Sequence, residues 1–319
     1  MKSDYGVLYS SQAANTYTVS IVGIDGKLVA SAETSTPPTP TCANTAAGVV
    51  SPPVSMSNSR VYFMDATGAV HWLDPSGNKD QAPIATLPSP TASRRSMFAV
   101  SPDDAEMAVV VDNFTSGGAS TQLSMYDLNT GGTQRQLYSE TGSFTLWPIG
   151  WHGTNNLVLA VSASCTQGGG PFCCGMLELH VVDPATANRR FTLGSRTSCV
   201  ITGPPSPAGA VCENNPTYSQ ATVLNWTAGT VRTISVQGPT FAYLSPDGQT
   251  VMMVDNSGTS FTEKPGNLPN LFACTWIDDI HVLSGGDAQH QPRVTDTTIG
   301  QSVPVAAEGD CAGRLPGGL

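Results

Sequence analysis

Charged residues are scarce in this sequence. They make up 12% of its 319 residues, with 14 Lys and Arg against 24 Asp and Glu. The formal net charge is −10, and no cluster of Lys or Arg offsets it. Nucleic acids and anionic membrane surfaces repel such a chain, so we expect neither as a partner. Long helices favour Ala, Leu, Glu and Lys, so this composition also disfavours a helical protein.

The sequence also lacks an apolar run of about 18 residues, so we expect no transmembrane helix and no insertion into a membrane. No signal peptide precedes the first strand-like residues, Tyr5–Tyr9. Two interpretations follow. Either the protein is cytosolic, or a secretion signal, or a lipoprotein leader with its lipid anchor, has been removed.

Eight cysteines favour the second interpretation, because an even number in a chain rich in Ser, Thr and Gly is typical of oxidised, extracytoplasmic proteins. Cys199 and Cys212 flank the turn-forming residues 203–209. A symmetric hairpin around that turn would place them opposite each other, close enough for a disulfide, and the alternative is two buried free thiols. Other pairings stay open: Cys165 with Cys173 or Cys174 would close a loop, and Cys274 with Cys311 would tie down the end of the chain.

Gly (32) and Pro (24) are abundant and divide the chain into short strands. The clearest example is Phe241–Asp255, two apolar strands joined by the turn Ser245–Gly248, in which Pro presets φ and Gly accepts a positive φ. Weaker copies of this hairpin recur along the chain, 31 to 55 residues apart. A unit of about 40 to 45 residues is typical of a four-stranded propeller blade. The hairpins are marked by Ser57, Ser101, Trp151, Ser206, Ser245 and Trp276.

The two ends of the chain predict how the ring closes. Gly6–Ser10, Tyr17–Gly26 and Lys27–Ala32 resemble the second, third and fourth strands of a blade, and Asp310–Leu315 resembles the missing first strand. We therefore predict an all-β fold, a single β-propeller domain over residues 1–319, in which a C-terminal strand joins the N-terminal blade. Seven four-stranded blades fit the markers best, and six or eight are the alternatives.

The sequences SPDD (Ser101–Asp104) and SPDG (Ser245–Gly248), each followed by an apolar strand, resemble the repeats of TolB-like and WD40-like (PD40) bacterial β-propellers. The GH…WD signature of true WD40 repeats and the S-x-D-x-G-x-T-W box of sialidases are absent. The resemblance covers nearly the whole chain. It implies a bacterial protein outside the cytoplasm that acts as an interaction module, and it transfers no catalytic residue.

Catalytic motifs are few. No G-x-S-x-G pentapeptide is present, since Gly118–Gln122 fails at its last position, and this disfavours a serine hydrolase. Carboxylates and neutral imidazoles suit zinc, but a pair of Asp residues in a hairpin turn is also explained by the turn itself. We therefore assign no metal, no cofactor and no catalytic residue. The weak metal candidates are Asp278, Asp279, His281, Asp287 and His290.

The loops at one rim of a propeller can carry recognition. Trp147, Trp151, Trp226 or Trp276 would stack there on a sugar or a peptide, or would instead fill the core between blades. The sequence thus predicts a secreted or periplasmic propeller that binds a protein or glycan partner without catalysis. The alternative is a hydrolase or lyase with its site at the channel mouth, near Asp278–His290.

Overall fold

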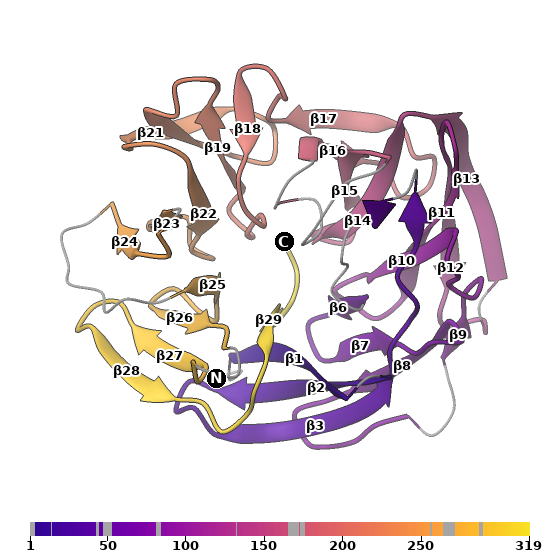
Figure 1. Cartoon of the computed structure of the whole chain (residues 1–319), viewed down its shortest axis with the longest axis horizontal. Helices are drawn as coiled ribbons and strands as arrows, with labels where there is room; N and C mark the ends of the chain where they lie inside the picture. Colours follow the sequence, from indigo (N-terminus) through magenta and orange to yellow (C-terminus); the bar gives the residue numbers. More distant parts are fainter. Residues whose placement is uncertain are drawn as a thin grey trace.

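The computed structural model describes residues 4–13, 15–42, 45–46, 53–80, 84–131, 133–164, 172, 176–255, 257–263, 272–286 and 290–319. Its strands form antiparallel sheets arranged as blades around a central axis (Figure 1). Over the described residues, six blades have four strands and one has three. The chain is therefore a seven-bladed β-propeller, and the predicted fold is confirmed.

Strands from both ends of the chain form blade 1. The inner strand β29 (Asp310–Leu315) pairs with β1 (Tyr5–Ala13), and β2 (Thr16–Gly23) and β3 (Leu28–Ser35) follow outward. In this register Tyr5 lies opposite Leu315. The predicted closure of the ring by a C-terminal strand is confirmed, and it pairs the inner edge of β1, which would otherwise be open.

The other blades follow in chain order, each from its inner to its outer strand. A short hairpin of β4 (Thr41–Cys42) and β5 (Thr45–Ala46) precedes blade 2. Blade 2 contains β6 (Val54–Met56), β7 (Val61–Met64), β8 (Ala69–Leu73) and β9 (Ala85–Thr86). Blade 3 contains β10 (Arg94–Val100), β11 (Glu106–Thr115), β12 (Gly118–Asp127) and β13 (Thr133–Gly142). Blade 4 contains β14 (Phe144–His152), β15 (Asn156–Ala163), β16 (Met176–Val182) and β17 (Arg189–Leu193).

The last three blades complete the ring. Blade 5 contains β18 (Cys199–Ile201), β19 (Ala210–Asn214), β20 (Gln220–Leu224) and β21 (Thr230–Ser235). Blade 6, the three-stranded one, contains β22 (Thr240–Leu244), β23 (Val251–Asp255) and β24 (Ser260–Thr262). Blade 7 contains β25 (Ala273–Trp276), β26 (His281–Ser284), β27 (Arg293–Asp296) and β28 (Gln301–Pro304).

The second strand of each blade explains the short apolar runs in the sequence. All four residues of β7 are buried, as are Val251–Val254 in β23. Such a strand lies between neighbouring blades, so both of its faces pack against apolar side chains. Outer strands such as β21 are mostly exposed and carry polar residues. The core therefore lies between the blades, around the second strands.

All six predicted hairpin markers lie at or beside the turn between the first and second strands of a blade. In the best copy, the Ser245 hydroxyl accepts a hydrogen bond from Thr250 N–H at 2.9 Å and donates one to Asp247 Oδ1 at 2.6 Å. Gly248 closes the turn with φ of 74°, a conformation that glycine adopts without strain. The local turn chemistry thus sets the position of each inner hairpin.

Two disulfides are present among the described residues. Cys199–Cys212 joins β18 to β19, and Cys274–Cys311 joins blade 7 to β29 of blade 1. Both pairings match the expectations from sequence, but the first hairpin is not symmetric. Cys212 lies opposite Ile201 and is therefore diagonal to Cys199. The tight turn at residues 206–209 lies late in the Pro-rich segment and shifts the register. The predicted bridge involving Cys165, Cys173 or Cys174 falls outside the described residues.

Candidate functional site

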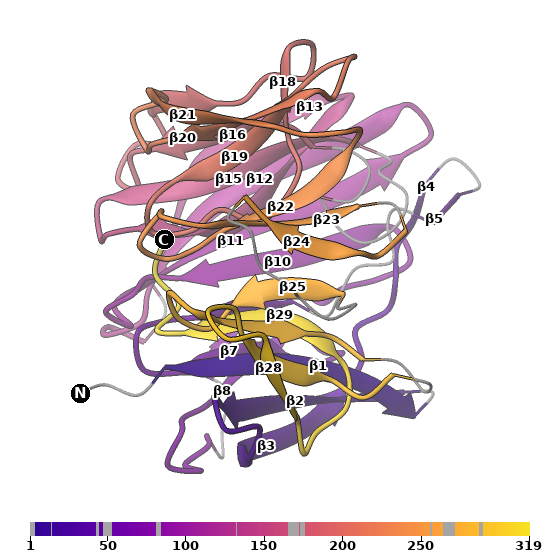
Figure 2. The ribbon, with the colours of Figure 1, turned by 90° about the vertical axis from the view of Figure 1, so that its left-hand side faces the viewer.

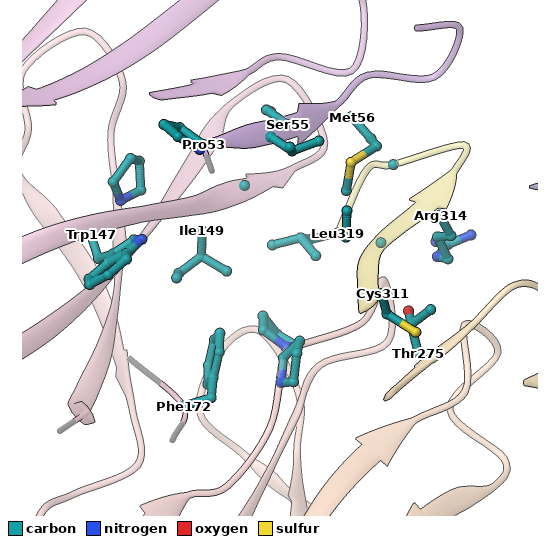
Figure 3. Close-up of a pocket in the computed structure, with 18 of the residues that line it drawn as sticks. Pro53, Ser55, Met56, Trp147, Ile149, Phe172, Thr275, Cys311, Arg314 and Leu319 are labelled. Carbon is teal, nitrogen blue, oxygen red and sulfur yellow. The ribbon is translucent and has the colours of Figure 1, made fainter. Parts of the chain in front are cut away.

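A cavity of about 300 Å³ lies at the centre of the ring. Its wall includes residues of six blades, among them the inner strands β6, β10, β14, β25 and β29 (Figure 3). The lining is mainly apolar and includes Met56, Trp147, Ile149, Pro204 and Pro205. The Cys274–Cys311 disulfide also borders it. Over the described residues, no helix is long and apolar enough to cross a membrane.

Arg314, on β29, is the only charged residue among the described residues that line this cavity. Burial lowers the pKa of its guanidinium, and the carboxylates of Asp4, Asp279 and Asp278 oppose that shift. Burial and the charge of Asp278 in turn raise the pKa of the Asp4 carboxyl. Three carboxylates therefore offset the single positive charge at this side of the cavity. An anionic ligand would therefore gain little electrostatic attraction from Arg314.

After β29 the chain stays within the ring. We call Pro316–Leu319 the crossing segment, because it passes over one mouth of the cavity. Figure 1 shows the end of the chain near the centre of the ring, and Figure 2 shows it at one face. Gly317 N–H donates to the Ser57 carbonyl at 2.8 Å, and Leu319 N–H donates to the Trp151 carbonyl at 2.7 Å. The segment thus bridges the inner hairpins of blades 2 and 4.

Side-chain contacts also hold the crossing segment in place. The guanidinium of Arg314 donates to the Gly318 carbonyl at 3.3 Å. Nδ1 of His152 lies 2.8 Å from the Leu319 carbonyl oxygen. Leu319 itself lines the cavity, and Figure 3 shows it between Ile149 and the strand that carries Arg314. The cavity is therefore partly filled by a side chain of its own protein.

Two glycines allow this close approach. A Cβ atom at Gly317 would lie 2.2 Å from Met56 Cβ and 2.5 Å from the Met56 carbonyl oxygen. A Cβ at Gly150 would lie 3.0 Å from Leu319 Cδ1. At Gly318 the nearest atom, Cγ of Pro102, would be 3.3 Å away. Gly317 is thus essential to the path of the segment, and Gly318 is not.

The four described members of the weak metal candidates point to different partners. The Asp278 carboxylate accepts hydrogen bonds from the N–H groups of Ile280 and His281, and its Oδ2 lies 2.7 Å from His281 Nδ1. Asp279 Oδ1 accepts instead from Asp247 N–H in blade 6, at 2.9 Å. His290 follows the far end of β26, near Phe272.

Asp287, the fifth candidate, falls outside the described residues. Within the described part of the chain, no three His, Cys, Asp or Glu side chains form a metal-binding group. The hairpin turn accounts for Asp278, because its carboxylate oxygens are already engaged by the turn and by His281.

The four candidate tryptophans are buried, with exposed fractions between 1% and 9%. The indole N–H groups of Trp151, Trp226 and Trp276 donate to carbonyls of Ala99, Pro207 and Tyr243 respectively, at 2.8–3.1 Å. They fill the core, and the expectation that they stack on a ligand at the rim is not supported. Only Trp147 borders the cavity.

Sequence reasoning missed Arg314 and the crossing segment. A signal was present: Asp310–Leu315 is predicted as the first strand of the N-terminal blade, and Pro316, Gly317 and Gly318 follow it directly. Pro ends a strand, and consecutive glycines permit close backbone contact. A segment leaving an inner strand in this way has to pass the channel mouth or turn outward, and the residues alone do not decide between these paths.

No protein-family model matches the sequence, and no curated protein matches it at a significant level. The resemblance to TolB-like propellers therefore stays a prediction. Among solved structures, the chain is similar to the dihydro-heme d1 dehydrogenase NirN in complex with DHE, with a TM-score of 0.51 and 14% identity over 99% of this chain and 75% of that one. BamB from Moraxella catarrhalis gives a TM-score of 0.39 and 15% identity over 77% and 66% of the two chains. The likeness to NirN shows the fold alone: both chains are β-propellers.

Proposed function

We propose that this chain is an extracytoplasmic β-propeller that binds a protein partner at the mouth of its central cavity. The two disulfides support the location, because such bonds form and persist in oxidising compartments. The central cavity supports the binding role. It is concave, mainly apolar and lined by six blades, and its volume of about 300 Å³ falls in the range of ligand sites.

The rim of this cavity is held rigidly. Asn58 N–H donates to the Pro102 carbonyl at 3.0 Å and joins blades 2 and 3, and the Trp151 indole joins blades 3 and 4. Rigid hairpins lose little entropy when a partner docks. A second cavity of about 340 Å³ lies between blades 3 and 4 and is lined by residues of these two blades alone, so fewer blades meet there than at the central cavity.

A protein fits this site better than a glycan. Sugar rings are usually held on exposed aromatic faces, but Trp147, the one tryptophan among the described residues that line the cavity, is only 9% exposed. The aliphatic and proline-rich lining suits an inserted apolar side chain. NirN is a dehydrogenase, but that activity does not follow from a shared fold. The separation of Asp279 and His290 from His281 likewise favours binding over catalysis near Asp278–His290.

Site-specific photo-crosslinking tests the proposal. A photoreactive amino acid replaces Thr275, which borders the cavity, or Val231, which is 56% exposed on the outer strand β21. In cells that produce the chain, we expect a crosslinked protein at position 275 and none at 231. Equal crosslinking at both positions, or none at 275, would contradict a binding site at the cavity mouth. Matching unfolding temperatures of the two variants would confirm that both are folded.

A further inference from the structure

We propose that the cavity mouth is a docking site for an extended polypeptide segment with a large apolar side chain, and that the crossing segment Pro316–Leu319 occupies this site in cis. The inference rests on the proposed function and specifies which part of a partner protein would bind. The partner segment would replace the crossing segment and use the same hydrogen bonds.

The main-chain contacts do not depend on sequence. Gly317 and Leu319, two residues apart, donate their N–H groups to the carbonyls of Ser57 and Trp151. This alternation is typical of an extended chain, in which every second N–H points the same way. Because both acceptors are backbone carbonyls, any extended segment can use them, as in peptide recognition by strand addition. Arg314 adds a donor for the carbonyl between them, that of Gly318.

The cavity is larger than its present occupant. Leu319 is one of its lining side chains, and about 300 Å³ remains beside it. A larger apolar side chain at the same place would fill more of this space, and each additional buried methylene favours binding. Trp147 and Ile149 provide apolar surface for such a side chain (Figure 3). The site therefore favours Phe or Met over Leu at the inserted position.

Two restrictions narrow the ligand further. The residue two positions before the inserted side chain has to be glycine, because Met56 leaves no room for a Cβ at Gly317. Acidic residues are disfavoured, because the charges of Asp4, Asp278 and Asp279 act on Arg314, the only charged residue among the described residues that line the cavity. The ligand class is thus an extended segment that is neutral or basic and carries a bulky apolar side chain two positions after a glycine.

Matched glycine variants test the inference. Gly317→Ala should expel the crossing segment, because its Cβ would lie 2.2 Å from Met56 Cβ, whereas Gly318→Ala should leave it in place after a shift of a few tenths of an ångström at the Pro102 ring, 3.3 Å away. The probe is the capped peptide acetyl-Leu-Pro-Gly-Gly-Phe-amide, and isothermal titration calorimetry measures its binding. If the crossing segment occupies the site about 90% of the time, only about a tenth of the protein is free to bind, and the apparent affinity for the peptide falls about tenfold. We therefore expect the peptide to bind Gly317→Ala about tenfold more tightly than the wild type or Gly318→Ala.

The peptide series gives a second measurement. Affinity for Gly317→Ala should fall from the peptide ending in Phe to that ending in Leu, and further to that ending in Asp. If Gly317→Ala does not fold, Leu319→Ser replaces it, since the loss of the inserted side chain weakens the hold of the crossing segment on the cavity and so favours its release. Equal affinity of the released and unreleased proteins, or an Asp peptide that binds as tightly as Phe, would overturn the inference.

The two proposals can fail separately. A crosslinked partner at position 275 without any peptide binding would overturn docking by an extended segment and leave the proposed function standing. Peptide binding without a crosslinked partner in cells would leave docking of an extended segment standing and overturn the proposed function.

Discussion

The inner hairpins of blades 3 and 6 differ from those of blades 4 and 7 in how they are held. In blades 3 and 6 a serine hydroxyl accepts an N–H within its own turn, Glu106 N–H to Ser101 and Thr250 N–H to Ser245, both at 2.9 Å. In blades 4 and 7 a tryptophan indole instead donates to the preceding blade. These bonds, from Trp151 and Trp276, end on the carbonyls of Ala99 and Tyr243.

The difference separates contacts that shape one turn from contacts that join blades. A turn bond spans at most a few residues, so its loss should loosen one hairpin. An inter-blade bond joins residues 52 or 33 positions apart, and it is buried at Trp151 and partly buried at Trp276. Its loss should affect the packing of two blades together. We therefore expect substitutions at blade junctions to cost more stability than substitutions within turns.

The junction of blades 3 and 4 should give the largest effect. Arg95 and Asp112 form a buried ion pair at 2.8 Å, and Arg95 also lies 4.1 Å from the ring centre of Trp147 in blade 4. Asp112→Asn leaves the buried guanidinium without its countercharge, so unfolding free energy should fall by about 3–5 kcal/mol in urea denaturation. In the matched control, Asp183→Asn removes the partner of Arg190 on the surface, and stability should hardly change. A loss of under about 1 kcal/mol for Asp112→Asn would contradict the importance of this junction.

The disulfides give the next effect. Cys274–Cys311 closes a loop of 37 residues across the ring closure, and Cys199–Cys212 closes 13 residues within one blade. Replacing each pair by serines should cost about 4 and about 3 kcal/mol respectively, because the longer loop restricts the unfolded chain more. Hydrogen exchange should also rise in β1 and β29 only when the first pair is removed. The opposite order of stabilities would show that ring closure does not depend on this bridge.

Trp276→Phe and Ser245→Ala compare the two hairpin types directly. Trp276→Phe removes a buried donor from the Tyr243 carbonyl and should cost about 1–3 kcal/mol, with faster hydrogen exchange in blades 6 and 7. Ser245→Ala should cost about 0.5–1.5 kcal/mol, with faster exchange only in its own turn. If Ser245→Ala loosened both blades, turn and junction contacts would not be separable.

The same division explains how much the sequence could predict. The turn chemistry around Ser101 and Ser245 is local, so the hairpins, the blade number and the missing first strand of blade 1 could all be inferred from residue order. The Arg95–Asp112 pair, the tryptophan bonds and the crossing segment depend on which distant residues meet. Contacts near Asp278 depend on distant residues too: His281 pairs with Asp278, but Asp279 accepts its hydrogen bond from Asp247 in blade 6.

The smallest expected effect is the dependence of stability on pH. Its sign differs between Glu213, at a blade junction, and Asp296, in a turn. Glu213 of blade 5 is fully buried and accepts hydrogen bonds from Thr240 at the start of blade 6. Burial raises the pKa of its carboxyl above the usual 4.5. The folded protein then binds this proton more tightly than the unfolded chain, so Glu213 makes folding more favourable as pH falls from above its folded pKa toward 4.5.

Asp296, in the outer turn of blade 7, behaves in the opposite way. The Thr298 hydroxyl and N–H bonds lower its pKa below the usual 3.8, so its contribution is lost as pH falls below 3.8. Stability measured against pH should therefore lose its slope above pH 4.5 in Glu213→Gln, and its slope below pH 3.8 in Asp296→Asn. Each slope is at most about 1.4 kcal/mol per pH unit, since one proton is involved. An unchanged profile above pH 4.5 in Glu213→Gln would mean that the carboxyl at this junction is solvated, and the junction would then be looser than its contacts indicate.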